Sequence, residues 1–233
     1  MNNRVLILDF GSQTTQLIAR RVRELQVYCE ILPCTASAER IRAFEPGAII
    51  LSGGPASVHA AEPPKADDAV WELDVPVLGI CYGMQLMVER AGGRVRPAAK
   101  REFGHAMLTH VRPSALLDGV SDPTKVWMSH GDQVEFLPSG FERVASSETC
   151  PDAVVQSTER AWCGVQFHPE VVHSTEGTRF LKNFLFGMAG LSPEWRMGSF
   201  IEEKTAAIRQ QVGAGHVVMG LSGGVDSTVA AAL

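Results

Sequence analysis

The sequence is short of positive charge, of paired cysteines and of long apolar runs, and each shortage excludes a class of protein. Its 233 residues carry 21 lysines and arginines against 26 aspartates and glutamates, a formal net charge of -5 at pH 7. This balance argues against a surface that coats nucleic acid. No apolar run approaches the roughly 18 residues that span a membrane, and residues 1–9 become acidic too early for a signal peptide. We therefore expect neither a membrane nor a nucleic acid as partner.

Cysteines at paired spacing are missing as well. The five cysteines stand at positions 29, 34, 81, 150 and 163, with no Cys-x-x-Cys pair. This pattern suggests neither a disulfide framework nor a zinc site, so we expect no metal, and a reducing cytoplasm is the simplest location. Apolar residues are plentiful by contrast, at 45% of the chain, which is enough for a globular protein with a substantial core.

Apolar runs alternate with helical patterns in the first part of the chain. Residues 5–8, 48–51 and 75–80 are continuous apolar runs of the kind buried on both faces of a parallel sheet. Ile18, Val22 and Leu25 fall on one face of a helix after the first run. The alternation indicates βαβ units. We predict an α/β fold, an open and mostly parallel sheet with helices on both faces and its binding site at the carboxyl ends of the strands. Further expected elements are a strand at 28–32 and helices at 38–44 and 67–73.

The pattern changes twice after residue 93. Between residues 103 and 165, short alternating segments separated by turns, of which the last is 162–167, predict a small mixed or antiparallel extension at the edge of the sheet. A closing helix at 177–186 follows. We divide the chain into a domain at 1–187, a linker at 188–198 and the truncated start of a second domain at 199–233, because so short a segment does not normally hold its own core. Within it, Ser199 and Glu202 form a capping-box pattern for a helix ending near Gly213, and residues 216–221 predict a buried strand.

Residues 75–87 contain the strongest chemical motif. The apolar run ends in Gly79-Ile-Cys81-Tyr-Gly83 and passes into a helix-favouring stretch. This is the strand–turn–helix elbow of hydrolases with cysteine in place of serine. The glycines remove Cβ atoms that would clash, and the N-terminus of the following helix favours a thiolate. The alternative is a small buried core cysteine.

His168 and Glu170 are candidates for the base and its orienting group. Two residues apart in an extended segment, they lie on the same face, and Pro169 between them restricts the backbone. The carboxylate can then bind one imidazole nitrogen and leave the other for the thiol proton. A satisfied core histidine is the ordinary alternative, and a metal pair lacks further ligands at suitable spacing.

Two other segments have polar or glycine-rich patterns at the expected edge of the sheet. Residues 52–55, Ser-Gly-Gly-Pro, follow a buried strand, so the Gly54 N–H and the Tyr82 N–H could stabilise an oxyanion. An ordinary tight turn is an equal alternative. Residues 129–133 read as an exposed loop that could recognise the charged ends of an amino acid, or as a bland turn.

Together these motifs resemble the class I, or triad, glutamine amidotransferases. The resemblance covers residues 1 to about 187 and implies a flavodoxin-like core, with Cys81, His168 and Glu170 as triad and Gly54 and Tyr82 as oxyanion donors. Hydrolysis of glutamine to glutamate and ammonia through a cysteinyl thioester is the implied activity, with no cofactor. The residues implied to hold glutamine are Gln85, Ser129, His130, Gly131, Asp132 and Gln133.

The last motif resembles the pyrophosphate-binding loop of N-type ATP pyrophosphatases, in which backbone N–H groups bind anions at a helix N-terminus. Its residues are Ser222, Gly223, Gly224, Val225, Asp226 and Ser227. Downstream of a class I glutaminase domain, it resembles the family of glutamine-hydrolysing GMP synthases. That resemblance implies ATP, Mg²⁺ and XMP as ligands of a complete synthetase domain, and a homodimer of the full-length enzyme. We expect no GMP synthesis from residues 1–233 alone.

Two other functions share these motifs. A γ-glutamyl hydrolase or cysteine peptidase would use the same elbow and histidine and differ only in substrate. A non-catalytic module that binds glutamine is the third hypothesis, although the complete set of Cys81, His168 and Glu170 argues against it.

Overall fold

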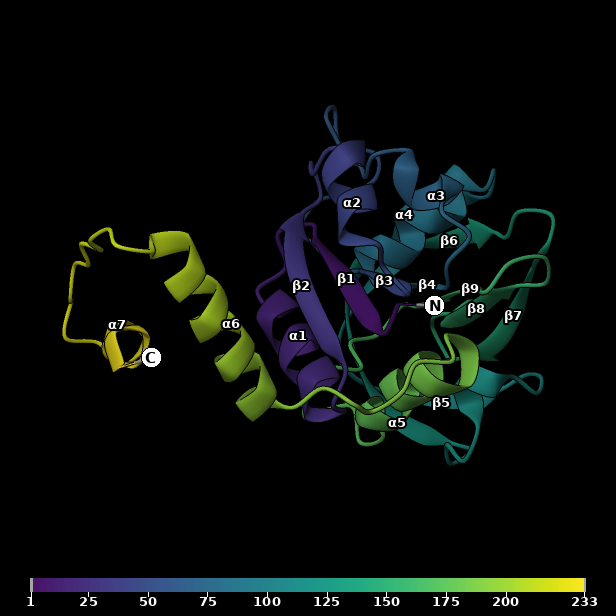
Figure 1. Ribbon diagram of the computed structural model, residues 1–233. Helices are drawn as coiled ribbons and strands as arrows, with labels where there is room; N and C mark the ends of the chain where they lie inside the picture. Colours follow the sequence, from purple (N-terminus) through teal and green to yellow (C-terminus); the bar gives the residue numbers. More distant parts are fainter. Residues whose placement is uncertain (1, 233) are drawn as a thin grey trace. The chain divides into compact units, whose positions relative to one another are not determined.

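The computed structural model describes residues 2–232, apart from the side chains of residues 99 and 100. Nine strands of this part form one sheet, in the order β2-β1-β3-β4-β9-β8-β7-β5-β6 (Figure 1). Strands β2, β1, β3, β4 and β9 pair in parallel, and the remaining pairs are antiparallel. The predicted α/β fold with a mixed extension is therefore confirmed. The strands are β1 (Arg4–Asp9), β2 (Tyr28–Pro33), β3 (Ala48–Leu51), β4 (Val77–Ile80), β5 (Arg94–His110), β6 (Thr124–Phe136), β7 (Phe141–Ser146), β8 (Val154–Ser157) and β9 (Trp162–Val165).

One strand lies elsewhere than the sequence pattern indicates. The pattern groups residues 162–167 with the extension, but β9 pairs in parallel with β4, Gly79 opposite Gly164 and Ile80 opposite Val165. It also pairs with β8 on its other side. Strand β9 thus joins the parallel sheet to the antiparallel part, and its carboxyl end lies beside the carboxyl end of β4.

Helices cover both faces of the sheet because its inner strands are apolar on both sides (Figure 1). In β1, Val5 and Ile7 pack in the core cluster that contains Ile18 of α1, whereas alternate residues such as Leu6 pack with Ile41 of α2. Helices α1 and α5 contribute to the first cluster, and α2, α3 and α4 to the second. The helices of this part are α1 (Thr15–Glu24), α2 (Ala38–Phe44), α3 (Ala69–Glu72), α4 (Tyr82–Arg90) and α5 (Gly177–Lys182), with a 3-10 turn η1 (Ala115–Leu117) and a π-helical turn η2 (Asn183–Met188).

The chain divides into two compact units between Pro193 and Glu194. The second unit contains α6 (Met197–Val212) and α7 (Val225–Ala232). Helix α6 begins before Ser199 with no side-chain cap, so the predicted capping box is wrong, although Gly213 does follow the helix end.

The predicted strand at 216–221 is also wrong, because those residues form no regular element. A strand needs a neighbour to pair its N–H and C=O groups, and residues 194–232 contain no other strand. Separately, none of the described helices is long and apolar enough to cross a membrane.

Candidate active site

Cys81 lies in a strained turn between β4 and α4. Its φ of 50° and ψ of -107° are unusual for a residue with a side chain, and such strain is concentrated at functional sites. Close packing requires both glycines of the turn. A Cβ on Gly79 would lie 2.6 Å from the Met84 backbone, and one on Gly83 would lie 2.4 Å from the Leu51 carbonyl oxygen. The turn therefore holds α4 tightly against the sheet and places Cys81 at the N-terminus of the helix, where the helix dipole favours negative charge.

His168 and Glu170 follow β9 and lie beside this turn. The Cys81 N–H donates to the Val165 carbonyl oxygen at 2.8 Å, which joins the ends of β4 and β9. The Nδ1 of His168 donates to Oε1 of Glu170 at 2.7 Å. The backbone turns at Pro169 and Glu170 instead of continuing as the expected extended segment, yet the two side chains still meet. Glu170 is completely buried and His168 nearly so.

The structure also brings the His168 ring to Cys81. A Cβ on Gly53 would lie 3.1 Å from His168 Cε1 and 3.6 Å from Cys81 Cβ. Burial by itself lowers the pKa of His168, but its interactions with Cys81 and Glu170 outweigh burial and raise the pKa to about 10. The imidazole is therefore stabilised as a cation between the sulfur and the carboxylate. A series of this kind can move the thiol proton to the imidazole and leave a thiolate nucleophile.

Sequence reasoning missed several residues that hold this series in place. Gln166 is completely buried, and its Nε2 donates to the Cys81 sulfur at 3.6 Å. Thr14 Oγ1 donates to Glu170 Oε1 at 2.7 Å, and Arg21 Nε donates to the Glu170 carbonyl oxygen at 3.1 Å. The only local signal for Gln166 is a polar residue at the end of a buried strand. Thr14 and Arg21 carry no local signal, because their contacts join segments far apart in the sequence.

The two N–H groups expected at an oxyanion site are available. Within the described part of the chain, neither the Gly54 N–H nor the Tyr82 N–H has a hydrogen-bond acceptor. Both residues line a cavity of about 350 Å³ that contains Cys81. Position 54 also requires glycine, because a Cβ there would lie 2.6 Å from the Phe10 carbonyl oxygen. Unpaired donors beside a thiol suit a negative charge that develops on a substrate oxygen.

Residues 129–133 do not form the expected loop. They lie within β6 and pair with β5, at a register irregularity between Pro97 and Glu102. The prediction was wrong because their polar and glycine-rich composition suits a strand that lines a cavity as well as a turn. Ser129, His130, Gly131 and Asp132 line the cavity that contains Cys81, and so do Arg101 and Phe103, which sequence reasoning missed. Gln133 is not among the residues described as lining it.

Gln85 lies at the junction between α4 and this segment. Its Nε2 donates to the Asp132 carbonyl oxygen at 2.8 Å and to Gln166 Oε1 at 3.1 Å. His130 is held in a similar way, with Nδ1 at 3.0 Å from the Asp132 carbonyl oxygen and Nε2 at 3.0 Å from Glu102 Oε2. Both side chains are paired with protein atoms, so in this arrangement they shape the cavity wall.

A second cavity, of about 300 Å³, is also lined by Cys81, together with Thr14 and His168. The thiol is thus accessible from two adjoining spaces that share Gly54 and Ser129 in their walls. A larger cavity of about 680 Å³ is lined by Trp71, Tyr82 and Arg90 and contains neither Cys81 nor His168. We place the candidate substrate site in the smaller cavities, because they hold the reactive groups.

Residues 222–227 belong to the second unit, where residues 222–224 form an exposed bend and Val225, Asp226 and Ser227 begin α7. Gly223 has a φ of 78°, a value that favours glycine. The Ser222 and Ser227 hydroxyl oxygens are 3.0 Å apart. A glycine-rich segment before a helix N-terminus suits an anionic group, and the pyrophosphate ligand that the resemblance implies stays a prediction.

Comparison with known proteins gives a consistent result. A profile of the family described as glutamine amidotransferase class-I matches residues 6–188. The glutamine-hydrolyzing GMP synthase of Phenylobacterium zucineum is 56% identical over 232 residues, which cover 98% of this chain and 45% of that protein. For the Pseudomonas aeruginosa LESB58 protein of the same name the identity is 51%, covering 99% of this chain and 46% of the relative. The chain thus spans about half the length of the curated relatives that it matches.

Solved structures have the same fold. A Thermoplasma acidophilum protein described as one subunit of a GMP synthase superposes with a TM-score of 0.72 at 27% identity, covering 87% of this chain and 97% of that chain. A Thermotoga maritima glutamine amidotransferase superposes with a TM-score of 0.59 at 19% identity, covering 91% and 94% of the two chains. The second likeness concerns the fold alone.

Proposed function

This chain belongs to the class I glutamine amidotransferase family, and from that premise we propose that it hydrolyses glutamine to glutamate and ammonia. The observation that carries the proposal is the series of Cys81, His168 and Glu170, in which the imidazole donates to a completely buried carboxylate at 2.7 Å. Cys81 is the nucleophile, His168 transfers the proton, and Glu170 orients the imidazole and stabilises its positive charge.

The reaction proceeds through a thioester. The Cys81 thiolate attacks the carbon of the glutamine side-chain amide, and the amide oxygen takes up negative charge. The unpaired N–H groups of Gly54 and Tyr82 stabilise that oxygen, each contributing about 2.7–4 kcal/mol to lowering the barrier. His168 protonates the departing ammonia, and then removes a proton from the water that hydrolyses the thioester to glutamate.

The cavity of about 350 Å³ beside Cys81 is proposed to hold the substrate. Its wall contains Asp132, whose carboxylate suits the α-ammonium group of an amino acid, and Arg101, whose guanidinium suits the α-carboxylate. Gln85 braces this wall through its 2.8 Å hydrogen bond to the Asp132 carbonyl oxygen. Gln133 extends the proposed binding segment without lining the cavity.

Release of glutamate from glutamine by the purified chain tests the proposal. Cys81→Ala should abolish release with the fold intact, whereas Cys34→Ala, at a half-buried cysteine outside the site, should leave it unchanged. A glutamine analogue bearing an electrophile should form an adduct that mass spectrometry maps to Cys81. Appreciable glutaminase activity in Cys81→Ala would refute the assignment.

Two other functions are separated by the same assay. A γ-glutamyl hydrolase or cysteine peptidase would cleave γ-glutamyl peptides in preference to free glutamine. A non-catalytic glutamine-binding module would bind glutamine and release no ammonia. The strained turn at Cys81 and the interaction of Cys81 with His168 favour turnover, because neither is needed for binding alone.

We further propose that the complete protein passes this ammonia to a synthetase domain that aminates XMP to GMP. The names of the relatives and the turn at residues 222–227 support this. In the complete domain that turn would hold the pyrophosphate part of ATP together with Mg²⁺. The domain would use this ATP to activate XMP. We assign residues 1–187 to the glutaminase domain, 188–198 to a linker and 199–233 to the start of the synthetase domain. A cytoplasmic location and a homodimer belong to the same proposal.

The synthetase part of the proposal can be tested separately from glutamine hydrolysis. Full-length protein should form GMP from XMP, ATP and glutamine, and should also do so from XMP, ATP and ammonia. Cys81→Ala should remove only the reaction with glutamine. Loss of both reactions in a folded Cys81→Ala protein would contradict the division into an ammonia-producing and an ammonia-using part.

A further inference from the structure

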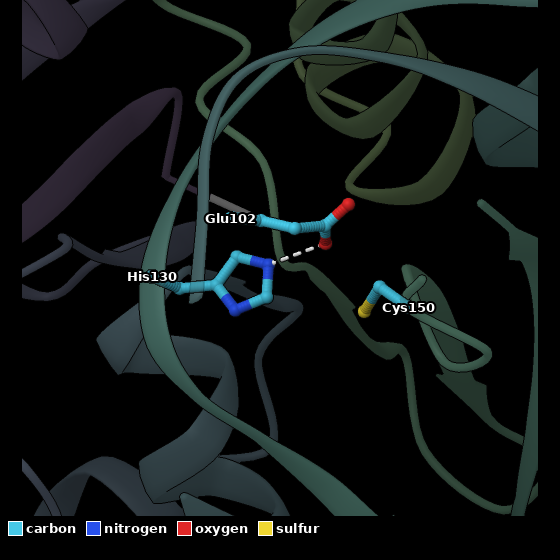
Figure 2. A group of neighbouring side chains, drawn as sticks. All are labelled: Glu102, His130 and Cys150. Atoms are coloured by element: carbon cyan, nitrogen blue, oxygen red, sulfur yellow. Dashed lines mark hydrogen bonds and ion pairs between the residues drawn. The ribbon is translucent and has the colours of Figure 1, made fainter. Parts of the chain in front are cut away.

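Three side chains with metal-binding atoms meet beside the substrate cavity although they are far apart in the sequence. Glu102 comes from β5, His130 from β6, and Cys150 from the connection between β7 and β8. Their ligand atoms all lie within 4.8 Å of one another. Figure 2 shows the carboxylate, the imidazole and the thiol gathered close to one another, with the dashed line joining Glu102 and His130.

The three groups are withdrawn from water. The side chains of His130 and Glu102 are only 1% and 13% exposed, and Cys150 is 1% exposed. Buried polar groups of this kind ordinarily require a defined partner. The catalytic series of Cys81, His168 and Glu170 does not use them.

The hydrogen bonds of His130 prepare its second nitrogen for a cation. Nδ1 lies 3.0 Å from the Asp132 carbonyl oxygen, which can only accept, so Nδ1 carries a hydrogen atom. In the neutral ring, Nε2 then directs a lone pair toward the Glu102 oxygen at 3.0 Å. Two acceptor atoms this close require a proton or a metal ion between them. A backbone carbonyl on the far nitrogen is also the usual support of a metal-bound histidine.

We propose that Glu102, His130 and Cys150 bind one Zn²⁺ ion. One oxygen, one nitrogen and one sulfur ligand suit zinc and do not suit Mg²⁺ or Ca²⁺, which prefer oxygen alone. Zinc bond lengths of about 2.0–2.3 Å in a tetrahedron place ligand atoms roughly 3.5 Å apart. The observed limit of 4.8 Å therefore requires a contraction of about 1 Å, which side-chain rotation can supply.

The surroundings provide the rest of a zinc site. Thr149 Oγ1 donates to the other carboxylate oxygen of Glu102 and so orients the ligand. A cavity of about 390 Å³, lined by Glu102 and Thr149 among others, offers an entry path and room for a water molecule as fourth ligand. The ion would tie the β7–β8 connection to the strand that carries His130, and so stiffen a wall of the proposed glutamine cavity.

Cys81 and His168 are a second thiol–imidazole pair that could also bind a metal ion. The experiment must therefore distinguish binding at this pair from binding at Glu102, His130 and Cys150. Equilibrium dialysis against Zn²⁺ with elemental analysis should give one ion per chain for the wild type, for Cys81→Ser and for Cys163→Ser. The last is a matched control, because Cys163 is completely buried and lies outside the cluster. Cys150→Ser should bind Zn²⁺ at least about tenfold more weakly.

Co²⁺ in place of zinc reports on the sulfur ligand directly. The thiolate-to-cobalt absorption band should be present in Cys81→Ser and absent in Cys150→Ser. Glu102→Gln should bind the metal ion more weakly and keep the absorption band. This variant replaces Cys150→Ser in the test if circular dichroism shows that Cys150→Ser does not fold. The proposal is overturned if the wild type binds no Zn²⁺ or if Cys81→Ser loses the ion. It is also overturned if Cys150→Ser binds Zn²⁺ as tightly as the wild type does. Where Cys150→Ser does not fold, wild-type affinity in Glu102→Gln overturns it instead. These outcomes do not depend on glutamine hydrolysis.

Discussion

Replacing Glu170 by glutamine isolates the charge of the orienting carboxylate from its shape. Oε1 of Glu170 accepts from His168 Nδ1 and from Thr14 Oγ1, each at 2.7 Å, and a glutamine oxygen could accept both hydrogen bonds. The other carboxylate oxygen, Oε2, has no donor among the described residues, so the new NH₂ group would displace no existing hydrogen bond. The main change in Glu170→Gln is therefore the loss of one buried negative charge.

The size of the effect follows from the pKa of His168, which burial lowers but which contacts with Cys81 and Glu170 raise to about 10. Removing one opposite charge at this distance lowers a pKa by about 1–3 units. At 1.36 kcal/mol per unit this corresponds to about 1.4–4 kcal/mol of lost imidazolium stabilisation. We expect kcat/KM to fall by about 10- to 1,000-fold, which is less than for loss of the nucleophile.

The pH profile distinguishes this explanation from a loss of packing. In the wild type the imidazolium persists until pH rises to the His168 pKa of about 10, so the alkaline decline of kcat/KM should lie there. A lower pKa in Glu170→Gln should move that decline to about pH 7–9. Glutamate release measured from pH 6 to about 10.5 would show the shift, with Glu142→Gln on β7 as the control. An unchanged pH profile of kcat/KM in a folded Glu170→Gln protein would refute the reasoning. A loss of kcat/KM as large as that in Cys81→Ala would mean that Glu170 does more than orient the imidazole.

Three other substitutions test individual contacts. Gly83→Ala adds a Cβ 2.4 Å from the Leu51 carbonyl oxygen and should lower the free energy of unfolding by roughly 1–3 kcal/mol; an unchanged urea midpoint would contradict this. Gln166→Leu removes the donor 3.6 Å from the Cys81 sulfur and should slow alkylation of that thiol at neutral pH roughly tenfold, a result that an equal rate by mass spectrometry would rule out. Thr14→Val removes a 2.7 Å hydrogen bond to the triad carboxylate and should lower kcat/KM, with the activation free energy raised by about 0.5–1.5 kcal/mol; unchanged kinetics in a folded variant would contradict this.

The candidate site was predictable where its chemistry is local. The glycines at 79 and 83 indicated a sharp turn, and the packing against Met84 and Leu51 explains why no other residue fits. Prediction failed where composition was ambiguous. Residues 129–133 suggested a loop and lie in β6, because a polar, glycine-containing segment can also be a strand beside a cavity. Residues 216–221 suggested a strand and form none, because an apolar run becomes a strand only where a neighbour accepts its hydrogen bonds.

The sequence by itself determined the alternation of strands and helices, the cysteine turn and the pairing of His168 with Glu170, because each depends on residues that are neighbours in the chain. Only the tertiary structure decided that β9 pairs with β4, which brings His168 to Cys81. The tertiary structure alone also placed Thr14 beside Glu170, Gln166 beside Cys81, and Cys150 beside His130. Pairing between distant strands depends on the topology and register of the whole sheet, and the periodicity of one segment contains no record of which segment will be its neighbour.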